Sequence, residues 1–369
     1  MSRAAFEVSG LLNDQPSGVG IYGQGLLRAL GEVGESRDSI GLIAPIQRWG
    51  KRQHLREFNL RIVPYLTGSF LSSSFSILHL LDTRMPKLYR GPLVATIFDV
   101  VNALSISADL GFAPDRFRQR KLRAYQRIAA RADAVVTLSD SVRRSFLELF
   151  PKARRVEVIP PGVDAPTATS SPPPVETCLA VRGIEPPYVL GVGALCPRKN
   201  LGATLRAFES ALRVQPRLRL VLVGAPAYGW EGSKAEATAR RLASHVVFTG
   251  YVPRDVLWAA ITHAECLLQL SHYEGYGFPV LEALAVGTPV VASRRGGIEE
   301  AAGGAAWLVD PQDESQVDGA LRSVLDGAPE VRTKCAVGRQ HARVSTWKAA
   351  AAAVLRLHGE ILDDHRKNA

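Results

Sequence analysis

The sequence predicts an α/β protein that consists of two doubly wound domains. Short apolar runs alternate with amphipathic helical patterns along the whole chain, which is typical of βαβ units and parallel sheets. A proline-rich segment at residues 166–187 interrupts this alternation near the middle. The length of 369 residues also favours two domains of ordinary size over one. One large α/β domain with a proline-rich loop is the alternative.

The first half of the chain contains the apolar runs of one parallel sheet. The expected strands are Ala4–Val8, Ile40–Ala44, Ser76–Leu80, Leu93–Phe98, Ala134–Leu138 and Val156–Ile159. Between the fourth and fifth of them, Asp115–Arg131 predicts a helix, because its apolar residues recur every three or four positions. Residues 1–165 are therefore expected to form an N-terminal domain.

A linker and a second domain are expected next. Residues 166–187 contain six prolines, which neither a helix interior nor a central strand tolerates. The strands expected after them are Tyr188–Val192, Arg219–Val223, Val246–Thr249, Cys266–Leu270 and Pro289–Ala292. These strands define a domain over residues 188–345. A last helical pattern, Trp347–Leu362, predicts that residues 346–369 form a C-terminal helix that can pack on either domain, including back on the N-terminal one.

Composition excludes several classes of protein. With 46% hydrophobic and 22% charged residues, the chain is globular rather than fibrous or disordered. The most apolar stretch, Cys266–Ser293, is interrupted by Glu274 and Glu282, so no transmembrane helix is expected. Glu7 and Asp14 fall where a signal peptide needs an unbroken apolar run, which indicates a cytoplasmic protein. The four cysteines lack metal-site spacing and are expected to be free thiols.

Basic charge is concentrated in the first half of the chain. The net charge is +10, and residues 1–180 carry an excess of seven basic residues against three in the remainder. Five arginines fall on one face of the expected helix: Arg116, Arg120, Arg123, Arg127 and Arg131. This face is interpreted either as solvated or as a docking surface for an anionic membrane. Nucleic acid is not expected as a partner, because no recognised binding motif accompanies the charge.

The segment Ser271–Glu282 carries the clearest chemical pattern. It follows an apolar strand and contains Gly275 and Gly277, which allow a close approach of the backbone to a ligand. Pro279 then favours the first turn of a helix, whose N-terminus would attract a phosphate group. Glu274 precedes this turn and Glu282 lies inside the helix, so the two carboxylates suit hydroxyls at two ends of an extended ligand. A surface turn with two solvated carboxylates is the alternative.

This segment resembles the signature of the retaining family 4 glycosyltransferases. The resemblance lies in EGYGFPVLEALAVGTPVVAS, which begins at Glu274. Four further segments resemble other parts of the family pattern in the same order along the chain, and they are Ser17–Tyr22, Gly193–Asn200, Phe248–Pro253 and Ser293–Glu300. The resemblance extends over roughly residues 4 to 365 and implies a GT-B fold, in which two Rossmann-like domains face each other across a cleft.

The resemblance also implies roles for particular residues. The N-terminal domain would bind the acceptor, and the second domain would hold most of the nucleotide sugar. Glu274 would contact the donor sugar, and Glu282 the ribose hydroxyls. Arg198 and Lys199 would neutralise the diphosphate, whose charge grows in the transition state. The alternative for Arg198 and Lys199 is that they are solvated side chains at the N-terminus of a helix. The other donor-site residues implied are Gly18, Gly20, Gly193, Tyr251, Val252, Gly275, Tyr276, Gly277 and Phe278.

The N-terminal domain departs from the family pattern at one strand end. Many relatives have a histidine where this chain has Phe98, next to Asp99. Asp99 is expected to accept a hydrogen bond from the acceptor or the sugar, with a turn-capping role as the alternative. Gly18 and Gly20 are expected in a glycine loop that approaches the phosphates, with a plain turn as the alternative. Ala194 also stands where many relatives have an arginine, which leaves the positive charge to the two cations after it.

The function implied is that of a retaining glycosyltransferase of polysaccharide or O-antigen biosynthesis. It would move a hexose, with mannose from a GDP-sugar as the first expectation, to a saccharide acceptor that can be lipid-linked, at the inner face of the membrane. No cofactor and no metal are expected, because Arg, Lys and helix N-termini meet the diphosphate charge. A UDP-sugar-dependent transferase and a non-catalytic sugar-nucleotide-binding protein are the alternatives. A dehydrogenase is disfavoured, because the glycines near residue 18 follow the first strand too late.

Overall fold

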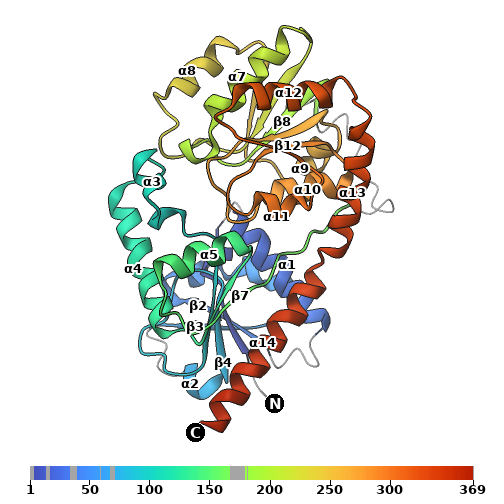
Figure 1. Ribbon diagram of the computed structural model, residues 1–369. Coiled ribbons are helices and arrows are strands. Elements are labelled where there is room, and N and C mark those ends of the chain that lie inside the picture. The colour runs from blue at the N-terminus through green and yellow to red at the C-terminus, as the bar shows by residue number, and fades with distance from the viewer. Residues whose placement is uncertain are drawn as a thin grey trace. The chain divides into compact units, whose positions relative to one another are not determined.

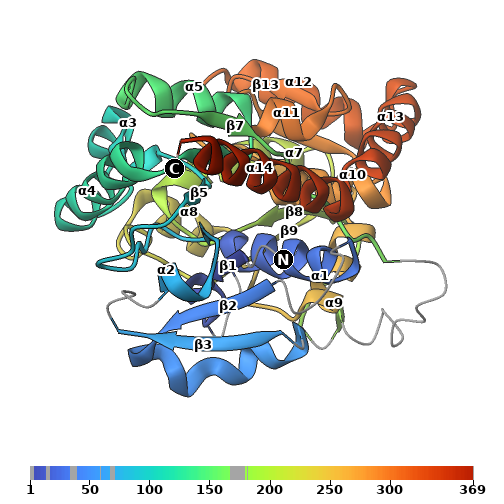
Figure 2. The same ribbon diagram turned by 90° about the horizontal axis from the view of Figure 1, so that it is seen from below.

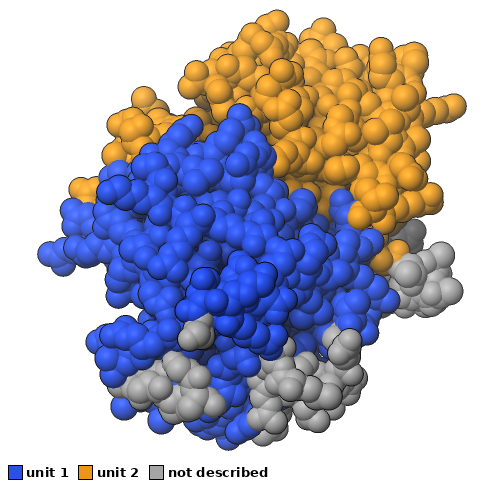
Figure 3. Space-filling model, turned by 60° about the horizontal axis from the view of Figure 1, so that its bottom comes forward, with its two compact units in different colours: residues 1–103, 116–164, 345–369 blue, residues 104–115, 165–344 orange. Residues whose placement is uncertain are grey.

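The protein consists of two compact units. The computed structural model describes residues 4–13, 17–33, 40–58, 60–66, 71–166, 179–180 and 182–368. Unit 1 comprises residues 1–103, 116–164 and 345–369, and unit 2 comprises residues 104–115 and 165–344. Figure 3 colours unit 1 blue and unit 2 orange. Each unit contains its own parallel sheet with helices packed around it (Figure 1).

Unit 1 is built on a sheet of seven parallel strands in the order β3-β2-β1-β4-β5-β6-β7. The strands are β1 Ala4–Glu7, β2 Ile40–Pro45, β3 Arg61–Tyr65, β4 Ile77–Leu80, β5 Leu93–Ile97, β6 Ala134–Thr137 and β7 Val156–Val158. Six of them confirm the expected strands. The strand β3 was not predicted, because Pro64 weakens a strand pattern, but β3 is an edge strand of the sheet, where proline is tolerated.

The helices of unit 1 surround this sheet. They are α1 Gly18–Val33, α2 Leu71–Ser74, α4 Asp115–Arg131, α5 Asp140–Leu149 and α14 Trp347–Lys367, with 3-10 helices η1 Ser9–Leu11, η3 Ile46–Phe58 and η4 Val101–Ala103. The bounds of α4 agree with the expected helix, whereas α14 continues five residues beyond the expected end at Leu362.

The C-terminal helix α14 packs on α1 in unit 1 (Figures 1 and 2). At Gly25 of α1 a Cβ atom would lie 2.1 Å from Cε2 of Trp347, so only glycine admits this ring. Further along α14, His358 is buried and its Nε2 lies 3.0 Å from Nδ1 of His79 on β4. The other ring nitrogen of His79 lies 2.8 Å from Oγ1 of Thr96 on β5. Buried polar contacts therefore connect α14 to the sheet.

Unit 2 is built on a parallel sheet in the order β10-β9-β8-β11-β12-β13. Its strands are β8 Tyr188–Val192, β9 Arg219–Val223, β10 Val246–Gly250, β11 Cys266–Gln269, β12 Val290–Ser293 and β13 Trp307–Val309. Five of them confirm the expected strands. With three residues, β13 is too short for an apolar run to predict it. A buried core of apolar side chains around Leu205, Phe208 and Leu222 joins the sheet to the helices.

The helices of unit 2 alternate with its strands. They are α3 Ser105–Asp109, η5 Pro197–Lys199, α7 Leu201–Leu212, α8 Lys234–Arg241, α9 Arg254–Thr262, α10 Phe278–Val286, α11 Ile298–Ala302, α12 Glu314–Leu325 and α13 Glu330–Val344. No helix in the described part of the chain combines the length and the apolar character that crossing a membrane requires.

The units differ from the expected domain bounds at one internal segment. Residues 104–115 were expected in the N-terminal domain, 1–165, but they pack in unit 2, where Phe112 stacks on His272 with ring centroids 6.0 Å apart. The expectation was wrong here because the segments before and after residues 104–115 belong to unit 1, and a sequence pattern does not indicate which unit a segment contacts. Most of the expected linker lies outside the described residues, namely 167–178 and 181.

Candidate functional site

Three loops of unit 2 meet at the carboxyl ends of neighbouring strands. They follow β8, β11 and β12, which are adjacent in the sheet. The backbone N–H of His272, after β11, donates to the carbonyl of Arg198, after β8, at 2.9 Å. The N–H of Gly297, after β12, donates to the carbonyl of Glu274 at 2.8 Å. Carboxyl ends of parallel strands are where α/β sheets bind ligands, so this is the candidate site.

The Glu274 side chain is the centre of this site. It is buried, with 8% of the residue exposed. Its Oε2 accepts a hydrogen bond from Nη1 of Arg198 at 2.6 Å, and its Oε1 accepts one from Nζ of Lys199 at 2.7 Å. Oε1 also accepts from Oγ of Ser271 at 2.7 Å and from Nε2 of Gln269 at 3.1 Å. The structure thus brings together the three charged residues that were expected to contact sugar and diphosphate.

The electrostatics of this cluster favour an ionised carboxylate. Burial by itself raises the pKa of Glu274, but the positive charges of Arg198 and Lys199 outweigh it and hold this pKa well below its usual range. An ionised, well-ordered carboxylate accepts hydrogen bonds and does not donate a proton near neutral pH. Glu274 is therefore suited to binding hydroxyl groups rather than to acting as a general acid.

Two glycines allow the loops to approach each other closely. Gly193 has a φ of +129°, and a Cβ atom there would lie 2.4 Å from Cε of Lys199. Gly296 has a φ of +62°, and a Cβ atom there would lie 2.1 Å from the carbonyl oxygen of Glu274. Both positions combine a left-handed backbone with a lack of space, so side chains are excluded at both. This explains physically why position 193 is a glycine.

The start of α10 lies directly after Glu274. Gly277 forms the N-cap with a φ of +114°, no side chain caps the helix, and a proline occupies its first turn. Tyr276 is buried against Phe278, with ring centroids 6.1 Å apart, and burial raises the pKa of its hydroxyl to about 12. A helix start without a side-chain cap is suited to an anionic ligand, as expected for the segment from Gly275 to Phe278.

Glu282 lies inside α10 and contacts Arg254, a residue that was not predicted for the site. The residue is 2% exposed, and its Oε1 accepts a hydrogen bond from Nη2 of Arg254 at 2.5 Å. Burial raises the pKa of Glu282, and the charge of Arg254 opposes this rise. Ser271 and Gln269, which bind Glu274, were missed as well. A signal for Arg254 exists in the sequence, since it directly follows the motif that ends at Pro253.

The loop after β10 contains both residues that were expected beside the nucleotide base. Tyr251 is 41% exposed and Val252 is buried at 4%. Phe248 on β10 is 43% exposed, and its ring centroid lies 5.8 Å from that of the buried Trp230. Exposed aromatic rings provide flat apolar surfaces on which a planar base can stack.

The expected site residues of unit 1 are placed differently. Gly18 and Gly20 lie in the first turn of α1 and not in a glycine loop, so that part of the expectation is wrong. The hydrogen bond from the N–H of Ile21 to the carbonyl of Ser17, at 2.9 Å, already belongs to this helical turn. Asp99 accepts a hydrogen bond from the N–H of Val101 at 3.1 Å, which is a turn-capping contact. Its contact with a substrate stays a prediction.

Phe98, beside Asp99, packs against α1. Its ring meets the ring of Tyr22 edge to face, with centroids 5.1 Å apart. The two ring nitrogens of a histidine at this position would need hydrogen-bond partners, whereas Phe98 contributes an apolar contact to unit 1.

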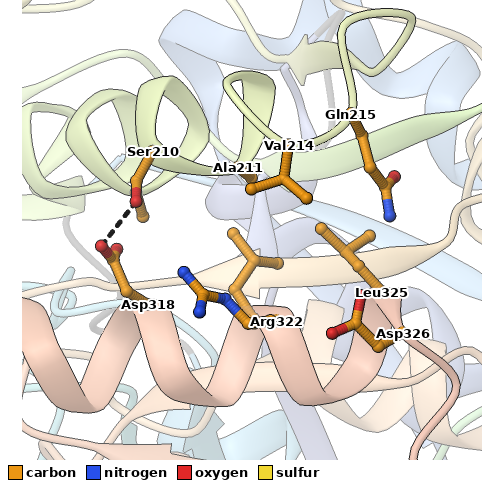
Figure 4. Close-up of a pocket in the computed structure, with 10 residues that line it drawn as sticks. Ser210, Ala211, Val214, Gln215, Asp318, Arg322, Leu325 and Asp326 are labelled. Atoms are coloured by element: carbon orange, nitrogen blue, oxygen red, sulfur yellow. Dashed lines mark hydrogen bonds between the residues drawn. The ribbon is translucent and has the colours of Figure 1, made fainter.

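The described residues also contain a groove and three free cysteines. Figure 4 shows a groove between α7 and α12, where Oγ of Ser210 donates to Oδ2 of Asp318 at 2.7 Å, and it shares no residue with the cluster around Glu274. Within the described ranges, no group of three or more His, Cys, Asp or Glu side chains could hold a metal ion. Cys196, Cys266 and Cys335 are free, and Cys178 lies outside the described residues.

Two family models together match most of the chain. Residues 181–338 match the glycosyl transferases group 1, and residues 23–166 match glycosyltransferase family 4. D-inositol 3-phosphate glycosyltransferases from Acidothermus cellulolyticus and Kineococcus radiotolerans are both 30% identical over 74% of this chain, which spans 63% and 67% of their lengths. A GDP-mannose-dependent alpha-(1-6)-phosphatidylinositol monomannoside mannosyltransferase from Mycolicibacterium smegmatis is 30% identical over 61% of each chain. The chain thus spans about two thirds or less of these relatives.

Solved structures agree in fold over nearly the whole chain. The sucrose-phosphate synthase of Thermosynechococcus elongatus has a TM-score of 0.74 at 20% identity, with 99% of this chain and 100% of that one covered. HepE of Anabaena, solved in complex with UDP-glucose, has a TM-score of 0.76 at 17% identity, with 98% and 100% covered. The matched family models, the relative at 30% identity and these folds lead to one conclusion: the chain belongs to the family 4 glycosyltransferases and has the GT-B fold of two Rossmann-like domains.

Proposed function

We propose that the protein is a retaining glycosyltransferase that transfers a hexose from a nucleoside diphosphate sugar to a saccharide acceptor. The observation that carries this proposal is the contact of Glu274 with both Arg198 and Lys199 at the carboxyl ends of parallel strands. A diphosphate is the anion that two adjacent cations of this kind bind well, with Arg as a fork and Lys as a point charge. Glu274 then serves as the acceptor for hydroxyls of the sugar.

The cluster suggests how donor binding and catalysis are connected. In the structure, Glu274 forms ion pairs with both cations. A bound diphosphate competes for the same cations, and the carboxylate becomes available to the hydroxyls of the sugar. When the glycosidic bond breaks, negative charge grows on the leaving phosphate, and Arg198 and Lys199 stabilise that charge more strongly than in the ground state. No metal is required in this proposal because the two cations supply the positive charge.

Retention follows from the proposed geometry of attack. The acceptor hydroxyl would approach the face from which the phosphate departs, and the departing phosphate would take its proton. Glu274 is a poor nucleophile in this scheme, because its carboxylate oxygens already accept four hydrogen bonds. Anomeric configuration of the product, measured by proton NMR, tests this part of the proposal.

The donor expected first is GDP-mannose. Support comes from the relative that uses GDP-mannose, which is 30% identical over 61% of this chain. UDP-sugars are the alternative, and the structure of HepE with UDP-glucose supports them through the shared fold. The proposed setting is polysaccharide or O-antigen assembly, with a saccharide acceptor that can be lipid-linked.

A stripe of arginines on α4 supports docking at the cytoplasmic face of a membrane. Arg116, Arg120, Arg123 and Arg127 are exposed, follow helical spacing and form no ion pair among the described residues. Arg131, expected on the same face, instead donates to the carbonyl of Gly91 at 2.6 Å. Unpaired arginines along one helix face attract anionic lipid headgroups, which would bring the protein to a membrane-bound acceptor as a peripheral protein.

Isothermal titration with GDP, UDP and ADP tests the donor site. Selective binding of one nucleotide that weakens in Glu282→Ala supports the proposal and names the donor class for transfer assays. Failure of all three nucleotides to bind more tightly than about 1 mM removes its main support. Binding without transfer to any acceptor would instead favour a non-catalytic sugar-nucleotide-binding protein.

A further inference from the structure

Arg254 and Glu282 form a charge pair between two helices of unit 2. Arg254 is the first residue of α9, and Glu282 lies within α10. Nη2 of Arg254 lies 2.5 Å from Oε1 of Glu282. The Glu282 side chain is 3% exposed and that of Arg254 is 39% exposed. The pair therefore joins a buried acceptor to a cation that reaches solvent.

A second contact fixes the orientation of this guanidinium. Its Cζ lies 4.7 Å from the centroid of the Trp258 ring, one turn further along α9. Stacking on an aromatic ring restricts the rotation of an arginine fork. Nη1 is buried and has no hydrogen-bond partner among the described residues. The ring contact thus orients the guanidinium, which donates to Glu282 through Nη2, while Nη1 has no acceptor in the described part of the chain.

Only one oxygen of the Glu282 carboxylate is engaged. Oε1 accepts from Arg254, and within the described ranges no other hydrogen bond reaches this side chain. An ionised carboxylate can accept at both oxygens, so Oε2 has capacity for a hydroxyl donor. Burial favours the protonated form of Glu282, and Arg254 is the charged group that opposes this effect. A neutral carboxyl would be a weaker acceptor.

We infer that Arg254 is a positioning residue for ribose recognition, which holds Oε1 of Glu282 so that the ionised carboxylate accepts a ribose hydroxyl at Oε2. This inference rests on the proposed function, because it takes Glu282 as the residue that binds the ribose of a nucleoside diphosphate. Arg254 itself acts through Glu282 and not on the reacting atoms.

The experiment compares wild type with Arg254→Met and Arg254→Lys. Arg240→Met is the matched control, because Arg240 is an exposed arginine of α8 in the same unit that also pairs with a glutamate, Glu236. The probes are the nucleoside diphosphate that wild type binds among GDP, UDP and ADP, and its 2′,3′-dideoxy analogue. Affinities are measured by isothermal titration at about pH 8 and about pH 6, and folding is checked by thermal melting.

The expected result is a loss of ribose discrimination in Arg254→Met. This variant should bind the nucleotide more weakly than wild type, by up to about tenfold as for the loss of one charged hydrogen bond, and should prefer the ribose form less than wild type does. The preference that remains should fall further as the pH is lowered, because burial favours the protonated form of Glu282 and Arg254 no longer opposes it. Arg254→Lys retains the charge and should keep the wild-type ratio between the two affinities at both pH values, a ratio in which protonation of the diphosphate cancels. Wild type and Arg240→Met should prefer the ribose form at both pH values.

Three outcomes overturn the inference, and the first of them leaves the proposed function intact. If wild type prefers the ribose form and folded Arg254→Met shows the same preference and pH profile, Arg254 does not position Glu282, and the proposed function stands. If wild type binds none of the three nucleotides, both proposals fail. Should Arg254→Met not fold, an equal loss for both probes in Arg254→Lys would overturn the inference.

Discussion

Replacing Glu274 by glutamine separates the stability of the charge cluster from its function. Glutamine has the same shape, but its amide nitrogen would face either Nη1 of Arg198 or Nζ of Lys199, which both need acceptors. The side chains of Arg198 and Lys199 are 26% and 10% exposed, so water compensates them only in part. Breaking a buried ion pair by removal of one partner costs about 3–5 kcal/mol, and the remaining amide acceptor reduces this to about 2–3 kcal/mol.

The free energy of unfolding that Glu274→Gln loses should be larger at neutral pH than in acid. The pKa of Glu274 is lowered in the folded protein from its ordinary value of 4.5. Its contribution to the free energy of unfolding is therefore fully present above that ordinary value and is lost as the pH falls below it. Urea unfolding at neutral pH should show the full difference between wild type and Glu274→Gln. The difference should shrink progressively in acid.

Glu274→Gln should lower the stability of the protein but should not weaken nucleotide binding. Glu274 competes with a diphosphate for Arg198 and Lys199, so Glu274→Gln should bind the nucleoside diphosphate at least as tightly as wild type while its transfer activity falls. Glu209→Gln is the control, because Glu209 pairs with Arg241 on the surface of the same unit and should change stability very little. Unchanged stability together with weakened nucleotide binding in Glu274→Gln would refute the reasoning.

Three further predictions concern other parts of the molecule. Reversing the exposed arginines of α4, Arg116, Arg120, Arg123 and Arg127, to glutamate should abolish cosedimentation with vesicles that contain anionic lipid; wild-type binding to purely neutral vesicles would contradict an electrostatic surface. Gly193→Ala should destabilise unit 2 by about 1–3 kcal/mol in urea unfolding, because the new Cβ would meet the Lys199 side chain at a left-handed φ. Gly31→Ala is the comparison, since no atom lies within 4 Å of a Cβ at this position, and it should not lower the stability of the protein. Burial lowers the pKa of His358 from 6.5 to about 4. Between these pH values the unfolded state binds a proton at this residue more readily than the folded state does. The free energy of unfolding should therefore fall as the pH drops through that range. The loss is about 3 kcal/mol, and an equal pH dependence in His358→Phe would disprove its origin in this residue.

The sequence by itself determined most of the local structure and the chemical character of the site. Strands such as β8 and β9 were predicted with the bounds that they have, because buried strands require continuous apolar runs. The apolar run Cys266–Leu270 predicted a strand, and the segment Ser271–Glu282 predicted a glycine turn and a helix start, because glycine and proline restrict the backbone locally. Such properties depend on neighbours along the chain and are therefore readable from it.

Only the tertiary structure decided which distant residues meet. Pro64 was compatible with a strand because β3 became an edge, and residues 104–115 joined unit 2 although the chain around them belongs to unit 1. Arg254 reaches Glu282 from another helix, across 28 positions of sequence. Contacts of this kind depend on how elements pack in three dimensions, and the periodicity of one element carries no information about the side chains that a neighbouring element will bring to it.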